Sequence, residues 1–207
     1  ASRAAGTGRS VMKLRMAATW LALMIATSGC LSIKAYVDPQ LPRVGYADLL
    51  ARAAPRPVSL RVDFHRNGEP ATLGVSAARA AVRSVVEKSK LFSTLLDKPA
   101  DDVDRLEIVL DNVGDTGEAA GKGALTGLTF GAKGSQVTDG YVFTATFRAV
   151  GRPAVTKIYR HAIHSTIGNA EGPPGLVAEE SVRAAFDKVV EGLVLNLLLD
   201  LQKEEQI

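Results

Sequence analysis

The feature that most constrains this chain is the stretch Met12–Cys30, near its beginning. Two basic residues give the stretch a positive start, and an uncharged, mostly apolar run, Met16–Ala26, follows them. Three small residues, Thr-Ser-Gly, lead from that run to Cys30, which is the single cysteine of the 207 residues. A charged start, an apolar run of about 7–15 residues and a small-residue end are typical of a secretory signal peptide.

Two other interpretations of the stretch are disfavoured. A membrane-spanning helix needs about 20 apolar residues, and this run is about half that length. A buried helix would require a large core around it, because no polar residue gives the run an outer face. The stretch therefore favours export from the cytoplasm, and we expect translation to begin at Met12, so that residues 1–11 take no part in the fold.

A small-residue cleavage site directly before a cysteine resembles the lipobox of bacterial lipoproteins, which signal peptidase II cleaves. The resemblance implies that residues 1–29 are removed and that Cys30, as the first mature residue, carries acyl chains, including palmitate. Leu31 stands where an aspartate would retain the protein in the inner membrane, which implies the outer membrane. Thr27 departs from the family, since leucine is usual at that position. Two or more acyl chains anchor a protein firmly, and a single cysteine excludes an internal disulfide.

The charge of the chain depends on the expected cleavage. The whole sequence has 25 basic and 22 acidic residues. Four of the basic residues and none of the acidic ones precede Cys30, so 21 basic and 22 acidic residues remain in the mature part. We therefore expect no nucleic-acid partner, since the mature sequence has no basic patch.

The mature part divides into a tether and one domain. Residues 30–57 contain four prolines and predict a lipidated tether that holds the domain away from the bilayer. Residues 58–207 contain the hydrophobic patterns of a folded domain, which we expect to face the periplasm. The expected strands, which alternate apolar and polar residues, are Val58–His65, Leu106–Asp111, Tyr141–Val150 and Ala154–His164.

Two further segments predict helices, Ser76–Ser89 and Leu176–Gln202, because apolar residues recur in them every three or four positions. Ser76 is the expected N-cap of the first helix. Glu179 and Glu180 are expected in the first turns of the second, where the helix dipole favours acidic residues. A polar loop is expected over residues 97–104.

The resulting order is β-α-β-(Gly-rich insertion)-β-β-α. It predicts an α+β fold: a two-layer sandwich with a mostly antiparallel four-stranded sheet and two helices on one face. This order is similar to that of the periplasmic domains of TolB and of CsgG-type secretion lipoproteins. The resemblance lies at the level of the fold and carries no function by itself.

The glycine-rich insertion, residues 114–140, allows three interpretations. The first is a flexible loop or long hairpin, since glycine is common in such segments. The second is a close-packing surface, since Gly123, Gly127 and Gly131 recur every four residues. The third is a membrane-touching hairpin, such as CsgG-type proteins use to build a pore. In the last two cases Leu125, Leu128 and Phe130 would make the self-association or membrane contact, and a Gly127→Val change would impair assembly. A nucleotide site is disfavoured, because the glycine spacing does not match the dinucleotide fingerprint.

No catalytic or metal-binding pattern stands out in the sequence. We expect His65, His161 and His164 to be exposed strand residues, the last two on opposite faces. The acidic run at 101–104 lacks the glycine and glutamate of a calcium loop. Asp63, Asp111 and Asp139 would have to converge at strand ends to form a site.

These observations predict a non-catalytic protein without cofactor or metal. We expect a lipid-anchored binding or assembly module of an envelope transport, secretion or surface-structure complex, with partners among envelope proteins or further copies of itself. An envelope hydrolase acting on lipid or cell-wall material is the alternative. Single substitutions of the strand aspartates and histidines would distinguish the two.

Overall fold

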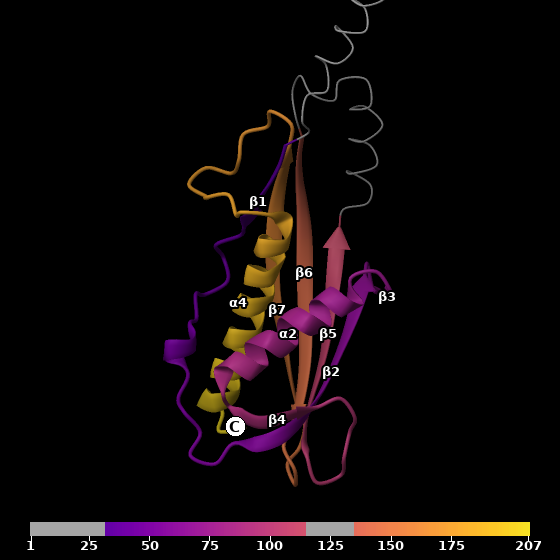
Figure 1. Cartoon of the computed structure of the whole chain (residues 1–207), viewed down its shortest axis with the longest axis vertical. Helices are drawn as coiled ribbons and strands as arrows, with labels where there is room; N and C mark the ends of the chain where they lie inside the picture. The colour runs from indigo at the N-terminus through magenta and orange to yellow at the C-terminus, as the bar shows by residue number, and fades with distance from the viewer. Residues whose placement is uncertain (1–31, 115–134) are drawn as a thin grey trace, which may run out of the picture. The chain divides into compact units, whose positions relative to one another are not determined.

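The computed structural model describes residues 32–114 and 135–207. Every helix and strand described below lies in one compact unit, Ile33–Ile207. Its core is one mixed β-sheet with two α-helices on one face (Figure 1). The expected α+β class is therefore confirmed.

The sheet has seven strands instead of the four expected. Six follow the order β1-β7-β6-β5-β2-β3, and β4 also pairs with β2. The pairs of β2 with β5 and with β4 are parallel, and the other pairs are antiparallel. The strands are β1 Ile33–Val37, β2 Arg56–Arg66, β3 Glu69–Pro70, β4 Phe92–Leu96, β5 Asp104–Gly114, β6 Ser135–Arg148 and β7 Val155–Ile167.

The four predicted strands are all present, with different ends. The third begins at Ser135, so the last six residues assigned to the glycine-rich insertion belong to β6. Asp104, expected in the polar loop, is the buried first residue of β5. Its carboxylate accepts a hydrogen bond from the Val150 amide, at 2.9 Å, which satisfies a buried charge at the edge of the core.

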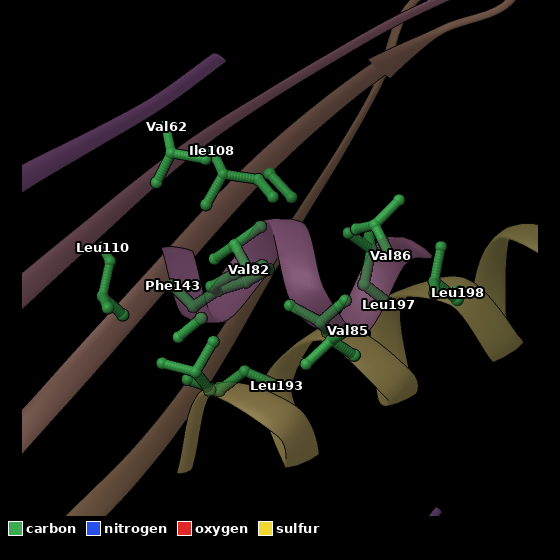
Figure 2. Packing of buried hydrophobic residues seen from close by; sticks show 14 of the residues in the cluster. Val62, Val82, Val85, Val86, Ile108, Leu110, Phe143, Leu193, Leu197 and Leu198 are labelled. Atoms are coloured by element: carbon green, nitrogen blue, oxygen red, sulfur yellow. The ribbon is translucent and has the colours of Figure 1, made fainter. Parts of the chain in front are cut away.

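The core lies between the sheet and the helices α2, Val75–Ser89, and α4, Val182–Lys203. One face of each central strand supplies apolar side chains at every second position, as the sequence pattern predicts. Figure 2 shows these side chains meeting those of both helices. They include Val62, Ile108, Leu110 and Phe143 from the sheet, Val82, Val85 and Val86 from α2, and Leu193, Leu197 and Leu198 from α4.

The expected helix starts differ from the observed ones. Gly74, in a left-handed conformation with φ 94°, precedes α2, and Ser76 lies inside the helix and does not cap it. The second helix begins at Val182, after Ser181, whose hydroxyl accepts a hydrogen bond from the Ala184 amide at 3.0 Å. Glu179 and Glu180 lie before that cap, so they do not occupy the first turn of the helix.

The interpretation of residues 30–57 as a tether is corrected for residues 33–50, which are attached to the domain. Ile33–Val37 forms β1, which pairs antiparallel with the end of β7. Tyr36 is 6% exposed, and a Cβ atom at Gly172 would overlap its ring.

Beyond β1 the chain remains attached to the domain. The Asn196 side-chain amide donates to the Pro42 carbonyl at 2.9 Å. The Gln202 side chain bonds both the amide and the carbonyl of Leu50. Because backbone groups of this segment bond to α4, residues 33–50 are part of the folded domain.

Candidate functional site

The described residues form a mostly apolar groove with a volume of about 760 Å³. It lies between the N-terminal ends of the two helices, over the sheet face that carries the core. Figure 1 shows the reason: α2 crosses the sheet obliquely while α4 runs along the strands, so the helices diverge toward their N-termini. The sheet between them is left partly uncovered.

Side chains of three strands form the floor of this groove. Phe64 comes from β2, Asn112 from β5 and Tyr141 from β6. The register places Tyr141 opposite Asn112 on the covered face of the sheet. The sequence predicts this inward orientation for Tyr141 but not that part of the face remains open.

The walls of the groove come from the two helices and the loop before α2. Gly74 allows the close approach of that loop to the floor, because a Cβ atom there would lie 2.9 Å from the Phe64 ring. On the opposite wall, the Phe186 ring of α4 meets the Tyr141 ring edge-on, with 5.8 Å between centroids. Leu73 lines the groove and is 86% exposed, so its side chain extends to solvent.

The groove also contains polar groups that are not engaged within the described residues. The Tyr141 hydroxyl has no hydrogen-bond partner there, and burial followed by the charge of Asp139 raises its pKa to about 12. Tyr141 therefore stays protonated at neutral pH and can donate a hydrogen bond. Asp139 and Arg66 both line the groove and form no ion pair with any described residue, whereas Arg183 is paired with Asp187 at 2.9 Å.

The groove lies toward one end of the sheet. At this end β1 begins with Ile33, which is paired with Ile167, the last residue of β7. Ser135, the first residue of β6, is paired with the same Ile167. Gly114, the last residue of β5, lies opposite Asp139 of the groove. The amino-terminal segment and the glycine-rich insertion thus join the domain at the end nearest the groove.

The three aspartates do not converge. Asp63 pairs with Arg61 at 2.9 Å, and Asp111 accepts a hydrogen bond from the Gly68 amide at 3.0 Å. Asp111 lies opposite Val142 in the register, so it projects from the face opposite to that of Asp139. The expectation that these carboxylates could form one site is therefore wrong.

His161 and His164 lie on opposite faces, as predicted, but neither is an exposed side chain. His164 contacts Asp38 at 3.1 Å and Thr138 at 2.9 Å. His161 lies against α4, close to Gly192. Burial lowers the pKa of His161, although the charge of Asp38 partly opposes the shift. Its Nδ1 accepts from the Ala162 amide at 3.1 Å, which requires the neutral ring.

The remaining predicted site residues lie outside the described residues. These are the lipidation site Cys30 and the expected contact residues Gly123, Leu125, Gly127, Leu128, Phe130 and Gly131. In the part that is described, no three histidine, cysteine or carboxylate side chains gather as metal ligands would. Neither α2 nor α4 is both long and apolar enough to cross a bilayer.

Comparisons with known proteins give no family. No family model and no curated protein sequence matches the chain. The solved structures that are similar to it at low TM-score include the three described next. The dodecamer of PelC from Paraburkholderia phytofirmans has 13% identity and a TM-score of 0.34, and covers 82% of this chain and 97% of its own.

Two further similar structures are lipoproteins by name. The minor lipoprotein from Acinetobacter baumannii has 7% identity and a TM-score of 0.33, and covers 72% of this chain and 94% of its own. The rare lipoprotein B from Shewanella oneidensis has 12% identity, a TM-score of 0.29 and the same two coverages. At these TM-scores the chain cannot be assigned to a fold family, and its similarity to TolB and CsgG-type domains stays a prediction.

Proposed function

We propose that this chain is a lipid-anchored protein of the bacterial outer membrane that faces the periplasm. In this proposal it is a non-catalytic binding module of an envelope transport, secretion or surface-structure complex, and the groove between α2 and α4 is its binding surface. The lipobox-like sequence before Cys30 supports the anchor, and Leu31 supports the outer membrane.

The observation that carries the binding role is the composition of the groove. Its cavity of about 760 Å³ falls within the range of about 300–1,000 Å³ that is usual for ligand pockets. Apolar and aromatic side chains line most of it, while Tyr141, Asp139 and Arg66 add a few polar groups. An apolar pocket with a few convergent polar groups is the usual form of a binding site.

A non-catalytic role is favoured by how the acid–base groups of the described residues are used. Asp63, Asp111 and His164 make hydrogen bonds or ion pairs within the fold. Tyr141, beside Asp139 in the groove, has a pKa raised to about 12, so its hydroxyl stays protonated near neutral pH and is not available there as a general base. The groove is therefore suited to holding a molecule without changing it.

The test of the binding role uses two substitutions on the same helix. Ala77 lines the groove, whereas Ala80 is exposed on the outer side of α2. Ala77→Phe should fill the groove, and Ala80→Phe adds the same ring outside it. Molecules that co-purify with the lipidated wild-type protein from membranes in mild detergent should be lost from Ala77→Phe and kept by Ala80→Phe. Equal retention by both variants would refute the assignment of the groove.

The anchor is tested separately. Mass spectrometry of the mature protein should find acyl chains on Cys30 and no residue before it. Cys30→Ser should release the protein from the membrane fraction. An unmodified thiol with the leader still attached would refute the lipid anchor, whatever the groove binds.

A further inference from the structure

We propose that the occupant of the groove is an acyl chain of a phospholipid from the bilayer to which the protein is anchored. This inference rests on the proposed function, because it requires the anchor at Cys30. It goes further by naming the class of ligand and the source from which it comes.

The first step is the length of chain between the anchor and the domain. Only three peptide steps separate Cys30 from Ile33, the first residue of β1. At no more than about 3.6 Å per residue they span at most ~11 Å. An acylated Cys30 therefore holds the end of the sheet where β1 begins close to the bilayer surface, because β1 is fixed to β7 in that position.

The second step is the distance from that end to the groove. Asp139 of the groove lies four residues along β6 from Ser135, which is level with Ile33 in the sheet. At a rise of about 3.4 Å per residue this is ~14 Å. One leaflet of the hydrocarbon core is about 15 Å thick, half of ~30 Å. With the end of the sheet resting on the bilayer surface, an extended acyl chain reaches the edge of the groove at Asp139.

Exposed apolar side chains gather at the same end. Leu73 is 86% exposed and Ile33 is 53% exposed, and Val182 and Val113 are also exposed. Leu73 and Val182 line the groove. Placing these side chains against lipid removes apolar surface from water, which is favourable by about 25 cal/mol of free energy per Å².

The first experiment measures the position of the groove relative to the bilayer. Because acylation occupies Cys30, Leu73→Cys and Leu50→Cys each introduce one free thiol for a fluorescent label. Leu50 is the matched control: it is 74% exposed and lies against the C-terminal end of α4. In phosphatidylethanolamine vesicles whose acyl chains carry nitroxides, the label at 73 should be quenched several-fold more than the label at 50. Equal quenching would overturn the inference.

The second experiment measures occupancy. The lipidated protein is purified in mild detergent from such vesicles, and bound phospholipid is quantified by mass spectrometry. We expect about one phospholipid per wild-type or Ala80→Phe protein and a loss of at least five-fold in Ala77→Phe. A groove that retains a peptide, or retention unaffected by Ala77→Phe, would overturn the inference.

These outcomes separate the inference from the proposed function. If Cys30 carries acyl chains but the two labels are quenched equally, the proposed phospholipid site is refuted and the proposed lipid-anchored binding module is not. An unacylated Cys30 would remove the anchor itself.

Discussion

Replacing Tyr36 by alanine tests whether β1 belongs to the domain or to a flexible tether. Tyr36 is 6% exposed and packs under the loop that contains Gly172. Removing a buried aromatic side chain costs about 3–5 kcal/mol. β1 is a short strand at the edge of the sheet and can relax, so we expect about 3 kcal/mol for Tyr36→Ala. A domain of this size loses about 2–4 °C in Tm per kcal/mol, which predicts a decrease of roughly 6–12 °C.

The assay is thermal unfolding of the mature protein followed by circular dichroism, with urea titration to obtain the free energy of unfolding. Lys34→Ala is the matched control, because Lys34 lies on the same face of β1 but is exposed. It should change the free energy of unfolding by less than about 0.5 kcal/mol. If Tyr36→Ala behaved like Lys34→Ala, β1 would contribute nothing to stability. The short chain segment after Cys30 would then no longer keep the groove close to the lipid anchor.

Two further predictions concern titration and helix capping. Burial lowers the pKa of His161 in the folded state below its unfolded value of about 6.5. As the pH falls below about 6.5, the unfolded state therefore binds more protons than the folded state does, and the free energy of unfolding should decrease. In urea titrations from pH 7.5 to 5.0, His161→Gln should show a smaller decrease than wild type; an unchanged pH profile would contradict the assignment. Ser181→Ala should cost about 1 kcal/mol of stability, because the Ser181 hydroxyl caps α4. Ser76→Ala should cost much less, and equal losses would show that the cap is wrongly placed.

The sequence predicts the central part of the fold well because periodicity is a local property. Alternation over Val58–His65 and Tyr141–Val150 identifies strands and also the face of each that is buried. The three- and four-residue spacing of valines and leucines identifies both helices. Positions such as Phe143 and Val82 are therefore assigned to the core correctly, and both are fully buried.

The missed strands have no such pattern. β1, β3 and β4 have five, two and five residues, which is too short for alternation to differ from chance. Each of them forms because a partner strand offers free backbone groups for pairing. β1, for example, pairs with the part of β7 that extends beyond its expected end to Ile167. Pairing between segments far apart in the chain is not encoded in the local period of either segment.

The candidate site was missed for a related reason. Tyr141 and Phe186 are predicted as core residues from their spacing, and their rings do contact each other. Only the angle between α2 and α4 leaves them facing a groove. Leu73 carried one local signal, an apolar residue between a turn and a helix, but that pattern does not reveal exposure.

The sequence alone determined that a signal-like leader precedes a single cysteine, that an α+β domain follows, and which faces of its central elements are apolar. Covalent order and local periodicity are sufficient for these conclusions. The tertiary structure decided that the segment after Cys30 is a strand of the sheet and that two diverging helices leave a groove near that strand. These features depend on the pairing and packing of elements that are distant in the chain, and this relation between anchor and groove is the basis of the proposed phospholipid site.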